Sequence, residues 1–183
     1  MRHVRTKYYN DDRNGQIEWQ AEYDGDKRDG LYEEFREDGS IRVRSNWKNG
    51  ELDGLCESFR EDGSIEVRSN WKNGKRDGLY ESFREDGSVR VRSNYKNGEI
   101  DGLYESFYED GSTCVRTNYK NGERDGMREW FRRDGSLWER SNWKNGVEIP
   151  LDDKVKLEPT ALELLKQAIT LLESQSLPTE KGE

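Results

Sequence analysis

Apolar and polar residues alternate along much of this chain, and glycine-containing turns interrupt the alternation at regular intervals. Between residues 55 and 72 the apolar positions are odd-numbered: Leu55, Phe59, Ile65, Val67 and Trp71. A period of two that carries β-branched and aromatic residues is typical of β-strands. The pattern predicts one strand near 55–60 and a longer strand near 64–72.

Two turn signals separate these strands from each other and from the next pair. Glu61-Asp62-Gly63 fits a three-residue hairpin loop with its glycine in the left-handed conformation. The segment 73–78 predicts a longer turn. If Arg60 lies opposite Ser64, and Trp71 opposite Leu79, both loops preserve the alternation. We therefore expect an antiparallel meander with one aromatic and aliphatic face and one polar face.

The same pattern occurs five times with a period of 24 residues. The phrase that begins at Ser45 with Ser-Asn-Trp-Lys-Asn-Gly has later copies that begin at Ser69, Ser93, Thr117 and Ser141. A constant period of this length indicates an array in which each unit buries its apolar side chains against its neighbours. The predicted fold class is an all-β repeat of tandem 24-residue β-hairpins in one elongated antiparallel sheet.

The repeats divide the chain into three parts. Residues 1–29 resemble a degenerate half-repeat that caps the array, and residues 30–149 hold the five repeats. In residues 150–183 the pattern changes, because Thr160 and Glu163 form a capping box before apolar residues at helical spacing. This predicts a C-terminal amphipathic helix over about 160–174, followed by a flexible tail.

Composition and charge restrict the partners. The net charge is -8 and the pI about 5.0, so phosphate backbones and anionic lipids are repelled. We expect no nucleic acid or membrane partner and favour a basic protein partner. Nothing approaches the roughly 20 apolar residues that span a bilayer, and the first residues lack an apolar signal-peptide core. The predicted location is the cytoplasm.

Residues suited to catalysis or to metal binding are scarce. The only histidine is His3, no cysteine and histidine pair suits zinc, and no glycine-rich loop precedes Lys-Ser or Lys-Thr. The many acidic residues recur with the repeats, so no carboxylate pair stands out as acid and base. We predict no catalytic residues, no metal, no cofactor and no enzymatic activity.

Positions where one repeat departs from the others are the candidate partner-binding residues. Four even-numbered positions in the last two repeats, on the predicted polar face, carry an aromatic ring or a thiol in place of Arg, Glu or Ser: Tyr108, Cys114, Trp130 and Trp138. The candidate surface also includes Tyr80, Tyr104, Arg92 and Arg116. Aromatic clusters on a polar face mark docking sites, occupied by the C-terminal helix or by a foreign partner. The other arginines and glutamates of the two charged ladders are interpreted as solvated.

The opposite, aromatic and aliphatic face is too long for the predicted helix to cover. Five repeats of two strands span roughly 48 Å, whereas a helix of about 15 residues covers about 22 Å. This face must therefore curl on itself, dimerise or receive another chain.

The repeated phrase Tyr/Trp-Lys-Asn-Gly-x-x-Asp-Gly-Leu-Tyr-Glu-x-Phe resembles the MORN repeat, in particular the variant of bacterial YwqK-type antitoxin proteins. The likeness runs from about Gly15 to Gly146. It implies tandem β-hairpins in one elongated, curved sheet, and it implies an antitoxin or immunity protein that binds a toxin. One departure is that Leu-Tyr or Leu-Cys follows the Asp-Gly pair, where the longer eukaryotic consensus has further glycines.

These observations favour a non-catalytic protein-binding module, with an antitoxin that blocks a basic toxin domain as the specific hypothesis. Two alternatives stay open. One is a structural scaffold or self-assembling repeat protein, including a homodimer. The other is a lipid-surface adaptor of the MORN type, which the acidic charge disfavours.

Overall fold

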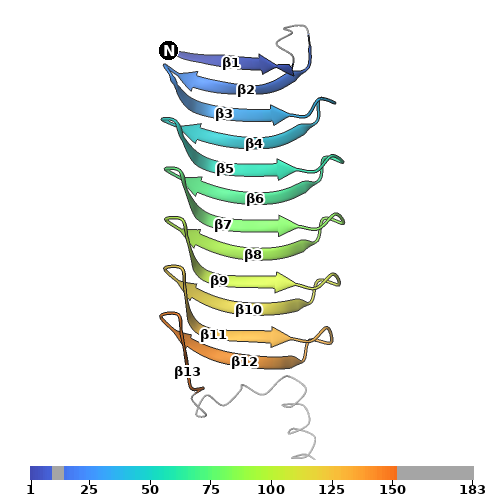
Figure 1. The fold of residues 1–183 in the computed structure, drawn as a ribbon, viewed down its shortest axis with the longest axis vertical. Helices are drawn as coiled ribbons and strands as arrows, with labels where there is room; N and C mark the ends of the chain where they lie inside the picture. The colour runs from blue at the N-terminus through green and yellow to red at the C-terminus, as the bar shows by residue number, and fades with distance from the viewer. Residues whose placement is uncertain (10–14, 152–183) are drawn as a thin grey trace, which may run out of the picture. The chain divides into compact units, whose positions relative to one another are not determined.

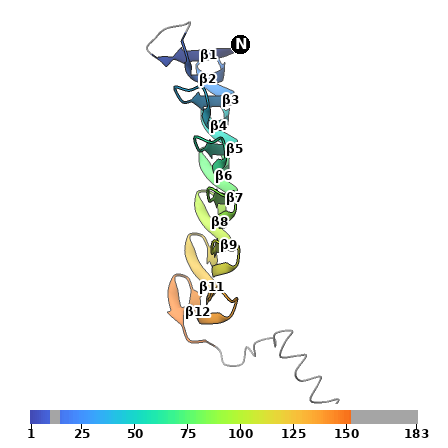
Figure 2. The same ribbon diagram turned by 90° about the vertical axis from the view of Figure 1, so that its right-hand side faces the viewer.

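The computed structural model describes residues 1–9 and 15–151, which form thirteen β-strands in one antiparallel sheet. The strands follow one another in chain order across the sheet, from β1 to β13 (Figure 1). The hairpin-repeat fold class is confirmed. The sheet is open and uncurled, so the curvature implied by the resemblance is not pronounced (Figure 2). The predicted helix at about 160–174 lies outside the described residues.

The thirteen strands have the following bounds: β1 (Arg2–Tyr8), β2 (Ile17–Asp24), β3 (Lys27–Phe35), β4 (Ile41–Lys48), β5 (Glu51–Phe59), β6 (Ile65–Lys72), β7 (Lys75–Phe83), β8 (Val89–Lys96), β9 (Glu99–Phe107), β10 (Thr113–Lys120), β11 (Glu123–Phe131), β12 (Leu137–Lys144) and β13 (Val147–Ile149).

The loop between β5 and β6 forms as the sequence predicts. The amide of Arg60 donates to the carbonyl of Ser64 at 2.9 Å, and Gly63 has a φ of 83°. Next to this closing pair Phe59 lies opposite Ile65, and beyond it the extra residue Glu66 in β6 produces a β-bulge, so that Ser58 lies opposite Val67. Past the bulge an odd-numbered residue of one strand lies opposite an even-numbered residue of the other. The predicted alternation is therefore not preserved.

The second turn is shorter than predicted. Asn73 and Gly74 alone form it, with φ values of 47° and 73°, and Lys72 pairs with Lys75. Two residues with positive φ make the tight turn that matches the twist of a β-hairpin, and Asn-Gly is its favoured sequence. The expectation of a six-residue turn over 73–78 is wrong, because residues 75–78 already belong to β7.

The register after this turn corrects the predicted pairing of Trp71 with Leu79. Trp71 lies opposite Arg76, and an irregularity follows before Ser69 meets Tyr80. Gly78, with a φ of 111°, lies in this irregular stretch, which holds more residues in β7 than in β6.

The two register shifts divide the apolar residues between both faces of the sheet, so the prediction of one apolar and one polar face is wrong. Residues directly opposite each other in the ladder point to the same face. The aromatic face carries the Trp or Tyr of each Asn-Gly turn, the following Tyr, and the serines and valines opposite them. The ion-pair face carries the Leu, Glu and Phe of the first strand and the Arg and Asn of the second.

The sheet is a single layer without a conventional hydrophobic core. Among the described residues, only Ala21 and Tyr23 are buried hydrophobic side chains. The other buried side chains are polar, and several belong to one serine and threonine position of each repeat: Ser45, Ser69, Ser93, Thr117 and Ser141. Such a sheet is stabilised mainly by its ladder hydrogen bonds and by side-chain pairs across neighbouring strands.

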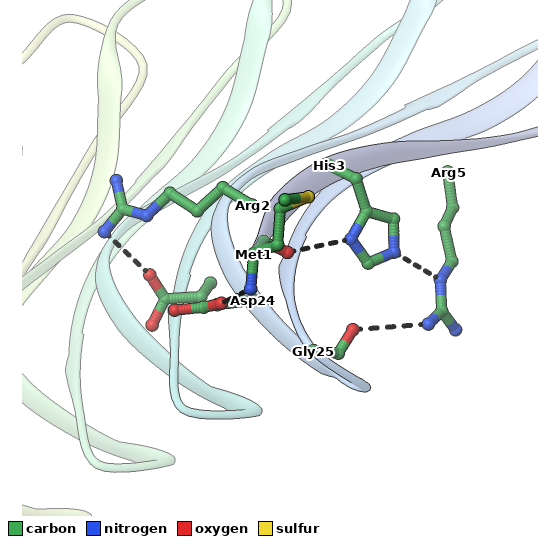
Figure 3. Close-up of polar contacts among 7 residues, drawn as sticks. Met1, Arg2, His3, Arg5, Asp24 and Gly25 are labelled. Carbon is green, nitrogen blue, oxygen red and sulfur yellow. Dashed lines mark hydrogen bonds and ion pairs between the residues drawn. The ribbon is translucent and has the colours of Figure 1, made fainter.

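The first strand, at the edge of the sheet, carries charged side chains that form polar contacts with one another and with the next loop (Figure 3). Met1 donates its terminal ammonium to Asp24 at 2.8 Å, and Arg2 pairs with Asp29 at 3.2 Å. The His3 ring accepts a hydrogen bond from Arg5 at 3.1 Å. Charged residues on an edge strand oppose pairing with another sheet.

Candidate functional site

The ion-pair face carries a ladder of Glu and Arg that is more buried than expected. Glu57 is 8% exposed, and its carboxylate accepts a hydrogen bond from Arg68 Nε at 2.9 Å. The guanidinium of Arg68 also lies 5.9 Å from the ring centre of Phe83, one repeat further on. The interpretation of these ladders as solvated charge is therefore wrong for four glutamates, because Glu33, Glu57, Glu81 and Glu105 are each the largely buried half of a cross-strand ion pair.

Two of the predicted binding residues belong to this ladder. Arg92 pairs with Glu81 at 2.9 Å, and Arg116 pairs with Glu105 at 3.2 Å. Both guanidiniums are half-exposed, and each lies over the Phe of the next repeat. The structure thus places Arg92 and Arg116 away from the aromatic face, in contacts that join neighbouring repeats.

Tyr108 joins two repeats through its hydroxyl group. This hydroxyl donates to the carbonyl of Phe131 at 2.8 Å, and Arg133 lies 5.2 Å from the centre of the ring. A hydrogen bond with the thiol of Cys114 raises the pKa of Tyr108. Cys114 is a free cysteine at the bulge of β10. These two candidates therefore contact each other, as their common departure from the repeat suggested.

Trp130 and Trp138 lie near the end of the array and differ in exposure. Trp130 is opposite Val115 and Glu139, and the guanidinium of Arg128 stacks on it at 3.7 Å. Trp138 occupies the bulge position of β12 and is 64% exposed, the one exposed tryptophan among the described residues. Exposed aromatic side chains of this kind are common anchors of protein interfaces.

Tyr80 and Tyr104 lie on the aromatic face, each against the ring of the following strand. The Tyr80 ring meets Tyr95 edge-on at 5.9 Å, and Tyr104 meets Tyr119 at 6.2 Å. Burial raises the pKa of Tyr104, so its hydroxyl stays protonated and is a donor at neutral pH. Each of these two predicted residues therefore contacts an aromatic ring, Tyr95 or Tyr119, that is not among the predicted binding residues.

A continuous row of side chains, here called the aromatic row, runs across the sheet along the Asn-Gly side of this face. Each strand from β2 to β13 contributes one residue, and aromatic residues alternate with residues of other types. In order across the sheet they are Tyr23, Arg28, Trp47, Leu52, Trp71, Arg76, Tyr95, Ile100, Tyr119, Arg124, Trp143 and Glu148.

Sequence reasoning missed the non-aromatic members of the aromatic row, because it assigned the residues after each Asn-Gly to a loop. A signal was present, however. The second residue after Asn-Gly alternates between aliphatic and basic from one repeat to the next, as Leu52, Arg76, Ile100 and Arg124.

Arg76 shows how the arginines of this row are held. Its guanidinium lies 5.5 Å from Trp71, 5.1 Å from Tyr80 and 5.4 Å from Tyr95, measured to the ring centres. Such cation–π contacts hold the cation on the aromatic surface without using its hydrogen-bond donors. The Nε atom of Arg76 is buried and has no hydrogen-bond partner among the described residues. The site therefore holds a cation in a fixed position on the aromatic surface.

The other two arginines of the row are placed in the same way. Arg28 lies 4.7 Å from the ring centres of both Tyr32 and Trp47, and Arg124 lies 4.6 Å from Trp143. Within residues 1–9 and 15–151, none of the three arginines forms an ion pair. The aromatic row is thus locally basic on a chain whose net charge is -8.

Buried hydroxyl groups orient the tryptophans of the row. Trp71 Nε1 donates to Ser69 Oγ at 2.8 Å, and Trp143 Nε1 donates to Ser141 Oγ at 2.6 Å. Ser69 is only 4% exposed, so the hydroxyl is a fixed acceptor. The rings are therefore in place before any partner arrives, which reduces the entropy lost on binding.

The Asp-Gly-Ser loops lie at the ends of the strands away from the Asn-Gly turns. Between two of these loops lies an open groove of about 620 Å³, whose lining mixes acidic residues (Glu66, Glu85, Asp86 and Glu109) with Arg60, Arg84 and Arg90. The Ser64 amide and hydroxyl lower the pKa of Asp62, and the other four loops repeat this arrangement. The acidic groups are therefore ionised at neutral pH and separated from the arginines of the aromatic row.

Within the described part of the chain, no group of three or more His, Cys, Asp or Glu side chains could hold a metal ion. The described residues also contain no helix that is long and apolar enough to cross a membrane.

A single sheet of tandem β-hairpins defines a repeat protein. The model of the MORN repeat variant matches this chain four times, at residues 28–49, 52–73, 76–97 and 100–121. The chain therefore carries tandem MORN repeats. None of the curated proteins matches it.

Proposed function

We propose that this chain is a non-catalytic protein-binding module whose aromatic face receives the partner. The observation that carries the proposal is the aromatic row, which combines half-buried, pre-oriented rings with arginines that form no ion pair within the described residues. Trp, Tyr and Arg are the residue types that dominate the energy of protein interfaces. The sheet formed by the described residues is open, so this face does not curl on itself.

The specific form of the proposal is an antitoxin or immunity protein of a bacterial cytoplasm, which blocks a toxin by occupying its surface. The resemblance to YwqK-type proteins supports it. So does the charge of -8, because the acidic loops would steer a basic toxin domain toward the sheet. In this arrangement the loops attract the whole partner, and the aromatic row binds one segment of it.

Co-purification tests the proposal. The tagged full chain is expressed together with the products of the genes beside it, and the wild type should retain one protein partner in stoichiometric amount. Trp71→Ala should weaken retention at least tenfold, whereas Leu55→Ala, a similar truncation on the ion-pair face, should change it little. Loss of retention only with Leu55→Ala would move the site to the other face. The absence of any stoichiometric partner would overturn the proposal.

Self-assembly is the second candidate, because β1 lies at an open edge of the sheet. The charges on β1, the shortness of β13 and Pro150 directly after it oppose edge-to-edge pairing. Light scattering decides the question, since a mass that rises with concentration would favour the scaffold or a homodimer. The lipid-surface alternative is tested by flotation with anionic vesicles, which the charge of -8 should prevent.

A further inference from the structure

The spacing of the aromatic row restricts the conformation of a segment that could lie along it. Its aromatic rings recur every second strand, which is about 9.6 Å at 4.8 Å per strand. A polyproline II helix has three residues per turn and rises about 3.1 Å per residue, or about 9.3 Å per turn. Every third side chain of such a helix would therefore face an equivalent position between two rings of the row.

Other regular conformations do not match this spacing. Two turns of an α-helix rise about 10.8 Å, which falls more than 1 Å out of step at each repeat. Three residues of an extended strand cover about 10 Å, but side chains alternate between opposite sides, so the third residue points away. Only the polyproline II helix keeps both the distance and the direction over several repeats.

The residues between the rings specify the side chains of such a segment. Arg28, Arg76 and Arg124 alternate with Leu52 and Ile100, so a basic position is followed by an aliphatic one. Successive arginines are four strands apart, or about 19 Å, and six residues of a polyproline II helix cover about 18.6 Å. A matching segment has an acidic residue at every sixth position and an apolar residue midway between.

We propose that the aromatic row binds an acidic, proline-rich protein segment in the polyproline II conformation, with carboxylates spaced six residues apart on the three arginines. This inference rests on the proposed function and names the ligand of that surface. The segment is pre-ordered, so little chain entropy is lost when it binds. Its proline rings pack on the tryptophan and tyrosine faces, as aromatic-lined grooves recognise such helices elsewhere.

The charges of the row favour a carboxylate-bearing segment over a second copy of the chain. Each arginine is held against aromatic rings and lacks an ion-pair partner in the described part of the chain, so an arriving carboxylate meets a cation that no acidic side chain there neutralises. A face-to-face pair of copies would oppose two surfaces that each carry these arginines, which costs energy through like-charge repulsion. A nucleic acid offers anions too, but the net charge of -8 repels its continuous phosphates.

The test uses the full chain and a synthetic blocked peptide of about 13 residues with the repeat Glu-Pro-Pro-Leu-Pro-Pro and a final Glu, which spans about 37 Å. Titration calorimetry should show one peptide bound per chain. A peptide with Gln in place of every Glu, and one with the carboxylates five residues apart, should each bind at least tenfold more weakly. Equal affinity for all three peptides, or tighter binding of a single-stranded oligonucleotide, would overturn the proposal.

Variants of the protein locate the peptide. Arg76→Gln should weaken peptide binding at least tenfold, and Arg76→Lys should recover only part of the loss, because it restores the charge without the planar donors. Lys72→Gln, which removes an exposed cation next to the row, serves as the matched control and should leave affinity within twofold. Circular dichroism verifies that each variant is folded. Binding unaffected by Arg76→Gln would overturn the assignment of this site.

The outcome is separable from that of the proposed function. If the peptide fails to bind but a natural partner is still lost with Trp71→Ala, the face is a protein-binding site and only the ligand assignment is wrong. If the partner is retained by Trp71→Ala and the peptide also fails, both the site and its ligand are wrong.

Discussion

The hydroxyl of Tyr108 donates a hydrogen bond of 2.8 Å to the carbonyl of Phe131, which lies one repeat further along the chain. In the preceding repeats an arginine serves the same acceptor position: Arg84 donates to the carbonyl of Phe107, and Arg60 to that of Phe83. The replacement of Arg by Tyr therefore preserves a contact between repeats. A departure from the repeat can thus keep a structural role while it also changes the surface.

This relationship predicts that Tyr108→Phe lowers the free energy of unfolding by about 1 kcal/mol, the usual value for a lost hydrogen bond. Tyr108→Arg should cost less, because Arg satisfies this carbonyl in the other repeats. Urea denaturation followed by circular dichroism measures the difference. Tyr119→Phe is the control, since the Tyr119 hydroxyl has no hydrogen bond among the described residues. Equal effects at both tyrosines would contradict the prediction.

The ion pairs between strands provide a second prediction. Glu81 is 8% exposed and accepts a hydrogen bond from Arg92, whose guanidinium lies over Phe107. Glu81→Gln removes the charge that holds this arginine, and we expect a loss of about 1 kcal/mol because Arg92 remains partly solvated. Glu85→Gln alters an exposed loop residue and should be nearly neutral. The comparison requires only the denaturation midpoints of the two variants, and a larger effect at Glu85 would contradict it.

The sequence predicted the period, the strands and the three-residue loops, because each of these depends on local residue types. It did not predict which residues share a face. The extra residue of each bulge shifts the pairing by one position, and nothing in the alternation of Ile65, Glu66 and Val67 marks the place. The residues around Asn73-Gly74 predict a longer loop, and Arg76 then falls in that loop and not in the strand where the structure places it.

The face of the sheet on which each candidate residue lies could not be predicted from the sequence either. Tyr80 and Tyr104 are on the aromatic face, whereas Arg92 and Arg116 are on the ion-pair face. Strict alternation predicts one face for all four, because each has an even number. The register shifts break that rule, so a single count from one end of the array cannot identify a binding face.

Acidification provides a third prediction. Hydrogen bonds from Ser64 lower the pKa of Asp62, and each Asp-Gly-Ser loop has the same contact. A carboxyl with a lower pKa in the folded state contributes stability that is present above the pKa of the unfolded state, which is about 3.9. This stability is lost as the pH falls from that value through the lower pKa of the folded protein.

We therefore expect the thermal midpoint to be nearly constant from about pH 7 to 5 and to decrease below about pH 4. Asp62→Asn keeps an acceptor oxygen for the amide of Ser64 but cannot titrate, so it should reduce the size of this decrease. Calorimetric scans between these pH values measure it. A midpoint that rises as the pH falls below 4 would contradict the assigned direction of the shifts.

Two buried serines on the aromatic face, Ser69 and Ser82, form a matched pair for mutation. Ser69 accepts a hydrogen bond from the Trp71 indole at 2.8 Å, whereas the hydroxyl of Ser82, which is 2% exposed, has no hydrogen-bond partner within residues 1–9 and 15–151. Ser69→Ala should cost about 1 kcal/mol of stability, weaken partner binding and shift the tryptophan fluorescence, because the ring loses its fixed orientation. Ser82→Ala removes a polar group that is buried without compensation, so it should be neutral or stabilising. Each variant loses one hydroxyl oxygen, so the two changes are matched in size. If the unfolding free energies of both variants changed equally, the indole hydrogen bond would have no part in orienting the aromatic row.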